Sequence, residues 1–289
     1  MLEGLVLAVC AAIIYGFLGI VFEVAGKRRY KIWDVMLYKQ ITGACIGAVA
    51  CVMIHSRIYH PYLLGLGSIG AAGYVVTLAV YLTASREQNI AANWTIINLS
   101  VIVPVLVSIF WFHDHVTTGK VAGVIVTLAS ILLIGQGVRG LQSNVMKSKW
   151  FACIVTAFLF NSWLLILFRF VPAGQEAAFT VYFYILSIPM ILAVKLKTDR
   201  NWHTPPNVVV LSAAGAATHW SGIMLTMLAL HRVSRVSLQP GVVVYPITNG
   251  LVIPIGVILG FLLLKQRVNG WAAAGIGFGM LGLILLSLG

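Results

Sequence analysis

Residues 4–25 read GLVLAVCAAIIYGFLGIVFEVA, a run of 22 residues in which Glu23 is the one charged side chain. The hydrocarbon core of a bilayer is about 30 Å thick and is crossed by roughly 20 apolar residues in helical conformation. Only helices and closed barrels satisfy their backbone hydrogen bonds in lipid, and so long a run without alternating polar residues is typical of a helix. The run therefore predicts a transmembrane helix at the start of the chain.

Further apolar runs of similar length follow along the whole chain. Of the 289 residues, 60% are hydrophobic and 9% are charged, whereas a soluble domain carries about 25% charged residues. The basic residues lie one to four at a time between the runs, and such scattered charges argue against nucleic-acid binding. We expect an all-α, polytopic membrane protein of about ten transmembrane helices, with no enzymatic activity and no cofactor. The predicted spans are 4–25, 35–54, 62–84, 90–112, 121–138, 150–168, 177–194, 207–230, 241–264 and 271–288.

Part of the fourth run recurs in the ninth. Both contain an aromatic residue, an asparagine four positions later and a proline beyond it, at offsets of 150 or 151 residues. Tyr74 in the third run corresponds to His219 in the eighth at an offset of 145. We therefore predict two five-helix repeats, 1–140 and 148–289, in one membrane domain. Because each repeat has an odd number of spans, the second enters the membrane in the opposite sense, and such inverted repeats occur in many transporters. The recurring residues are Trp94, Asn98 and Pro104, then Tyr245, Asn249 and Pro254.

The distribution of Lys and Arg between the linkers predicts the orientation. The linkers that follow the odd-numbered spans carry thirteen basic residues and those that follow the even-numbered spans carry five. Basic residues accumulate on the cytoplasmic side of a membrane. The count therefore predicts that both termini lie outside the cytoplasm, in a multi-pass protein of the cell's inner (plasma) membrane.

Polar and aromatic side chains inside the runs are the candidate site. Such groups are costly to bury in lipid, so they mark either helix–helix contacts or a functional cavity. For each residue taken alone, helix–helix hydrogen bonding is the alternative. As a set that recurs in both halves, we interpret them as the lining of a central substrate cavity. The candidate substrate-binding residues are Tyr15, Tyr74, Trp94, Asn98, Asn161, His219, Trp220, Tyr245 and Asn249.

Glu23 and Lys39 are the candidate ion-coupling residues. Glu23 lies near the end of the first predicted span and Lys39 lies a turn into the second. If the two helices are antiparallel with a tight linker, both side chains reach the same depth, and we expect them to form a pair. The alternative is a structural role near the membrane interface, where a long Lys side chain extends its charge toward water.

Small residues four apart predict close helix packing. Such pairs let helix backbones approach one another in lipid. They occur at Gly43 and Gly47 and at Gly275 and Gly279, where the stripe continues through Gly282. Packing within the chain is the first interpretation, and a homodimer through the last helix is the alternative.

The chain resembles the EamA-like transporters of the drug/metabolite transporter superfamily along essentially its whole length. Tyr15-Gly16 matches the aromatic-Gly pair of that family's first helix, although Glu23 stands where the family often has Lys. Tyr38-Lys39 stands at the aromatic-Arg position of the second helix, and Pro104 and Pro254 match the prolines of the fourth and ninth helices. The turns that follow, 112–116 and 264–268, lack the family's Glu.

The resemblance implies a secondary-active transporter, an exporter or exchanger, that moves a small organic solute by alternating access. Its partners are then a small-molecule substrate and membrane lipids. Characterised relatives mostly have cytoplasmic termini, which is opposite to the orientation that the charge count predicts. The alternative function is a non-transporting membrane component, such as a lipid-handling or complex-assembly subunit.

Overall fold

The computed structural model describes residues 2–55, 60–86, 90–112, 117–137, 144–198, 202–236, 240–265 and 270–288. All regular secondary structure in these ranges is helical. Of the predicted junction between the repeats, 138–148, residues 138–143 lie outside the described residues, as do the turn residues 113–116 and 266–268. The helices are α1 (Leu2–Lys27), α2 (Ile32–Met53), α3 (Pro61–Ala84), α4 (Ile90–Asn98), the short 3₁₀ helix η1 (Leu99–Val101), α5 (Ile102–Phe112), α6 (Thr118–Gly137), α7 (Asn144–Phe168), α8 (Glu176–Thr198), α9 (Pro206–Ser234), α10 (Pro240–Leu264) and α11 (Gly270–Leu288).

The helices are those of a multi-pass membrane protein. Among the described residues, seven helices are long and apolar enough to cross a membrane. The outer surface is also apolar: on α1, Ile13 and Phe17 are 45% and 49% exposed. Such surfaces are stable in lipid and would aggregate in water. Shorter apolar stretches are Ala92–Val107, Val121–Ile134 and Gly270–Leu285.

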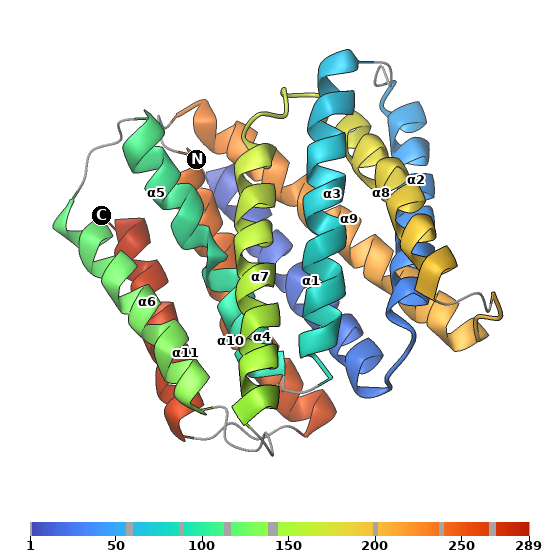
Figure 1. Ribbon diagram of the computed structural model, residues 1–289. Coiled ribbons are helices and arrows are strands. Elements are labelled where there is room, and N and C mark those ends of the chain that lie inside the picture. The colour runs from blue at the N-terminus through green and yellow to red at the C-terminus, as the bar shows by residue number, and fades with distance from the viewer. Residues whose placement is uncertain are drawn as a thin grey trace.

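Helices from early and late parts of the chain pack on one another. α6 lies along α11 at one edge of the molecule, and α2 lies along α8 at the other edge (Figure 1). Between these pairs, α1 packs on α9 and α10, while α7 packs on α3 and α4. The centre of the molecule is therefore built from both parts of the chain.

The predicted span 90–112 is divided into α4, η1 and α5. Pro104 has no N–H, so it cannot donate to the carbonyl of Ser100, four residues earlier. This carbonyl lies 3.1 Å from the Ser162 hydroxyl of α7, which shares its one proton between Ser100 and the Phe158 carbonyl at 2.7 Å. The proline thus frees a carbonyl that connects the broken span to α7.

The glycine stripe of α11 faces α6. A Cβ atom on Gly275 would lie 2.9 Å from the Ile134 backbone nitrogen and 3.0 Å from the Ser130 carbonyl oxygen. The Ser130 hydroxyl donates a 2.6 Å hydrogen bond to the Gly275 carbonyl. The stripe, on which the homodimer alternative depended, is therefore covered by α6 of the same chain.

Ion pairs hold α8 near both of its ends. Near its end, Lys195 pairs with Asp34 of α2, and these side chains are 1% and 2% exposed. At its beginning, Glu176 Oε1 lies 2.6 Å from Nδ1 of His231, near the end of α9. α8 is therefore attached to two neighbouring helices by polar contacts as well as by apolar packing.

Candidate functional site

A cavity lies among α1, α3, α4, α7, α9 and α10, and its empty space, including the part that opens to the outside, is about 680 Å³. None of its described lining residues is an Asp, Glu, Lys or Arg. The wall instead combines aromatic rings, aliphatic side chains, amides and hydroxyls, a composition typical of small-molecule sites. The lining residues are Tyr15, Leu18, Phe22, Tyr74, Thr77, Leu78, Tyr81, Trp94, Ile97, Asn98, Asn161, Leu164, Leu165, Phe168, His219, Thr226, Thr248 and Asn249.

The structure brings seven of the nine predicted substrate-binding residues to this cavity. They come from six helices that are separated along the chain, so their meeting is a property of the fold rather than of local sequence. Their role in binding stays a prediction. The seven are Tyr15, Tyr74, Trp94, Asn98, Asn161, His219 and Asn249.

The other two predicted residues lie off the cavity and connect helices. Trp220 Nε1 donates a 3.0 Å hydrogen bond to Thr180 Oγ1 of α8. The Tyr245 hydroxyl donates a 2.5 Å hydrogen bond to the carbonyl of Leu165, in the last turn of α7. Carbonyls in a last helical turn lack an intrahelical partner. For these two residues the structure gives the helix–helix contact that was the alternative interpretation.

Three buried hydrogen-bond donors at the cavity have no partner among the described residues. They are the hydroxyls of Tyr74 and Tyr81 and the indole N–H of Trp94. The three residues are 4%, 1% and 6% exposed. A buried donor without an acceptor costs about 1–3 kcal/mol, so each can be stabilised by a ligand that brings an acceptor.

The three cavity asparagines are oriented by their hydrogen bonds. Nδ2 of Asn98 donates to the Trp94 carbonyl at 2.7 Å, and Nδ2 of Asn249 donates to the Tyr245 carbonyl at 3.0 Å, so the two make the same bond to the residue four positions earlier. Nδ2 of Asn161 donates to Ser100 Oγ at 2.8 Å. Only the amide nitrogen can donate, so the carbonyl partners fix which atom is the nitrogen. The amide oxygens remain as acceptors at the cavity.

Lys39 and Glu23 are both fully buried, but they do not form the predicted pair. Lys39 Nζ lies 3.0 Å from His219 Nδ1. Glu23 lies 3.9 Å from Nζ of Lys27, one turn along the same helix. Within the described part of the chain, no ion pair joins Glu23 to Lys39. The prediction was wrong because it considered only the two helices joined by the linker, whereas α9 brings His219 to Lys39.

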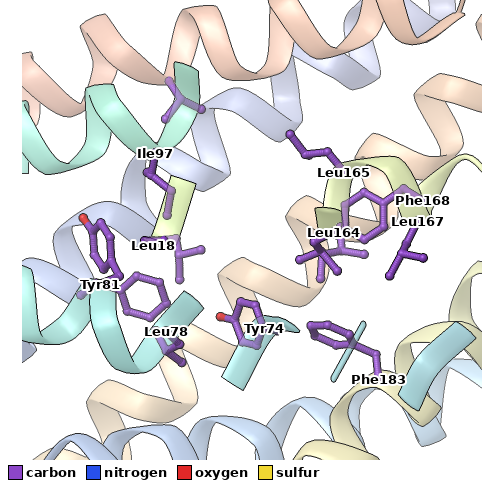
Figure 2. Close-up of a cluster of buried hydrophobic side chains, with 14 of the residues drawn as sticks. Leu18, Tyr74, Leu78, Tyr81, Ile97, Leu164, Leu165, Leu167, Phe168 and Phe183 are labelled. Atoms are coloured by element: carbon purple, nitrogen blue, oxygen red, sulfur yellow. The ribbon is translucent and has the colours of Figure 1, made fainter. Parts of the chain in front are cut away.

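Of the remaining wall, Tyr81 was expected from the sequence, because it shares a helix face with Tyr74. The other residues were not predicted, although they follow the predicted ones at helical spacing. On α3, Thr77, Leu78 and Tyr81 lie three, four and seven positions after Tyr74, and therefore on the same face. Figure 2 shows the apolar part of this wall, with Leu18 and Ile97 on one side, Leu164 and Phe168 on the other, and Tyr74 between them in this view. The helical period was the signal that could have found these residues.

Comparisons with known proteins establish the fold alone. No protein-family model matches the chain, and no curated protein matches it. A solved structure whose title is "Crystal structure of protein" has a TM-score of 0.63 and 15% sequence identity, covering 96% of each chain. At this identity the likeness establishes that the two chains share a fold and says nothing of function.

Proposed function

We propose that the chain is a secondary-active transporter of a small organic solute, an exporter or exchanger that works by alternating access. The observation that carries the proposal is the central cavity, to which both proposed repeats contribute a wall. Residues 1–140 contribute α1, α3 and α4, and residues 148–289 contribute α7, α9 and α10. A ligand held between two bundles is exposed to alternate sides of the membrane when one bundle rocks against the other. In this proposal the chain has no enzymatic activity.

The packing of the helices supports the proposed inverted repeat. If α1, α2, α3, α4–α5 and α6 correspond in order to α7, α8, α9, α10 and α11, exchanging the halves preserves the most extensive helix contacts. The contact of α9 with α10 is an exception, because α3 and α4 have none of similar extent. The contact of α1 with α9 becomes that of α7 with α3, and the contact of α2 with α9 becomes that of α8 with α3. The pairs α2–α8 and α6–α11 map onto themselves. A two-fold relation between the halves accounts for this pattern.

Individual residues support the same correspondence. Tyr74 and His219, which correspond in the proposed repeat, stack at 4.6 Å between ring centroids with an interplanar angle of 19°. Asn98 and Asn249 make the equivalent hydrogen bond in the two halves. The resemblance to EamA-like transporters agrees with this arrangement.

We also propose that the linker with Lys27, Arg28 and Arg29 faces the cytoplasm at the inner (plasma) membrane. The support is that three basic linkers meet at one end of the molecule. Arg86 donates a 2.9 Å hydrogen bond to the Tyr30 carbonyl, and Asn207 donates a 2.8 Å bond to the Tyr30 hydroxyl. A common end is what the charge count requires of these linkers.

The alternative, a lipid-handling or assembly subunit, is favoured by a different feature. An apolar groove lies between α10 and α11 and is lined by residues such as Pro254, Met280 and Ile284. Its empty space, including the part open to the outside, is about 550 Å³. Leu251 in its wall is 40% exposed and Ile284 is 51% exposed. Such a groove fits an acyl chain or an apolar helix of a partner, and it offers few polar groups to a soluble substrate.

Uptake into liposomes distinguishes the two functions. We expect the reconstituted protein to take up at least one member of a panel of amino acids, nucleosides, sugars and organic cations in a saturable way. Asn98→Leu and Asn249→Leu each abolish that uptake while the protein stays monodisperse, because they remove an acceptor from the cavity. Ser212→Ala, a buried position off the cavity, retains it. Saturable uptake of none of these solutes by the unmutated protein supports the alternative.

A further inference from the structure

The Lys39 side chain is fully buried and is enclosed mainly by aromatic rings. Its Nζ lies 4.6 Å from the ring centroid of Tyr74, 5.3 Å from that of Tyr184 and 5.9 Å from that of Phe22. Its hydrogen-bond partner is Nδ1 of His219. These groups come from α3, α8, α1 and α9, and within the described part of the chain no carboxylate lies within ion-pair distance of Lys39. Cation–π contacts and one imidazole stabilise an ammonium without neutralising its charge.

The contacts of His219 indicate which of its two ring nitrogens can donate a hydrogen bond into the cavity. Nδ1 lies 3.0 Å from Lys39 Nζ and 2.7 Å from the Tyr184 hydroxyl. When Lys39 is protonated it only donates, so the one lone pair of Nδ1 accepts and the proton of a neutral imidazole resides on Nε2. Nε2 makes no hydrogen bond to a described residue, and His219 lines the cavity. Its N–H is therefore a donor to the cavity, backed by a positive charge.

A second donor lies beside it. The Tyr74 ring stacks on His219, and the Tyr74 hydroxyl also has no partner among the described residues. The described lining contains no charged side chain, so the charge nearest to these two donors is that of Lys39. A cationic ligand would meet like charge at this wall. An anionic ligand would neutralise it, and the low dielectric of a buried site strengthens that attraction.

We infer that the cavity binds a small monoanion, a carboxylate with an apolar body, through this wall. In the proposed complex Lys39 is protonated and is the counter-charge of the carboxylate, which accepts hydrogen bonds from His219 Nε2 and the Tyr74 hydroxyl. The apolar body lies against lining side chains such as Leu18, Leu164 and Phe168, which Figure 2 labels. This inference rests on the proposed function only in taking the cavity as a ligand site. Lys39 is then a specificity-determining residue that acts through His219.

The test uses three probes that differ in charge more than in shape: phenylacetate, phenylacetamide and phenethylamine. Their affinities for the purified full-length protein are measured by titration calorimetry. We expect phenylacetate to bind at least tenfold more tightly than phenylacetamide, and phenethylamine to bind most weakly. Lys39→Met should remove the preference for the anion while leaving the affinity for phenylacetamide unchanged. Lys197→Met, at an exposed lysine on α8, should behave as the unmutated protein.

Three results overturn the inference. They are equal or tighter binding of the amide or the amine, an anion preference that persists in Lys39→Met, and no binding of any probe. If Lys39→Met does not fold, the three affinities of the unmutated protein decide the question. Saturable uptake of a neutral or cationic solute alone would refute the anion site and leave the proposed transport function standing.

Discussion

Replacing Lys195 with methionine removes one partner of the buried ion pair between α2 and α8. The two side chains are 1% and 2% exposed, so water cannot hydrate the carboxylate of Asp34 that remains. Breaking such a buried pair costs about 3–5 kcal/mol, because an uncompensated charge is left in a low-dielectric environment. At roughly 2–4 °C per kcal/mol for a chain of this size class, we expect the melting temperature to fall by about 10 °C.

The measurement is thermal unfolding of the detergent-purified protein, followed by the fraction that remains monodisperse. Two further variants separate the charge effect from loss of packing. Lys197→Met, two residues away on an exposed face, should melt as the unmutated protein does. The double variant Asp34→Leu with Lys195→Met should recover most of the loss, because removing both charges leaves none unpaired. A melting temperature of Lys195→Met equal to that of the unmutated protein, or a double variant as unstable as the single one, would refute the reasoning.

Three other variants have definite expected outcomes. Gly275→Ala should destabilise the protein by about 1–3 kcal/mol, because the new Cβ meets the backbone of α6. Gly277→Ala should not, because no atom lies within 4 Å of its new Cβ, and thermal unfolding compares the two variants. Tyr245→Phe should cost about 1–3 kcal/mol by leaving the Leu165 carbonyl without its donor, and a stability equal to that of the unmutated protein would count against this bond. We propose Glu23 as an ion-coupling residue, so Glu23→Gln in proteoliposomes should lose gradient-driven accumulation and keep substrate exchange; unchanged accumulation would remove Glu23 from coupling.

The helical membrane architecture was predictable because it depends on composition and run length. Each predicted apolar run corresponds to helix in the structure, with ends that differ by a few residues, as for 4–25 against Leu2–Lys27. For the run 90–112, the sequence could predict only a kink at Pro104. It could not predict the new partner of the freed carbonyl, because that partner belongs to α7. The partner, Ser162, lies 62 residues away from Ser100 along the chain.

The candidate site residues that recur in both halves were predictable. The side-chain contacts between helices far apart in the sequence were not. Asn98 and Asn249 recur in equivalent places, and both line the cavity. Tyr245 recurs equally with Trp94, but its hydroxyl is taken up by a helix end that no local pattern indicates. The partner of Lys39 was mistaken for the same reason, because His219 is 180 residues away and comes close only when α9 packs on α2.

The accessibility of the cavity from each side of the membrane tests alternating access most directly and needs no known substrate. The four native cysteines are first replaced with alanine, and Thr226→Cys or Thr77→Cys then places a thiol on the cavity wall. A membrane-impermeant maleimide is added to one side or the other of proteoliposomes of known orientation. Ser212→Cys, buried on α9 and off the cavity, serves as the control that stays unlabelled. We predict that each cavity cysteine is labelled from both sides; labelling from one side only, or from neither, would contradict transport through this cavity.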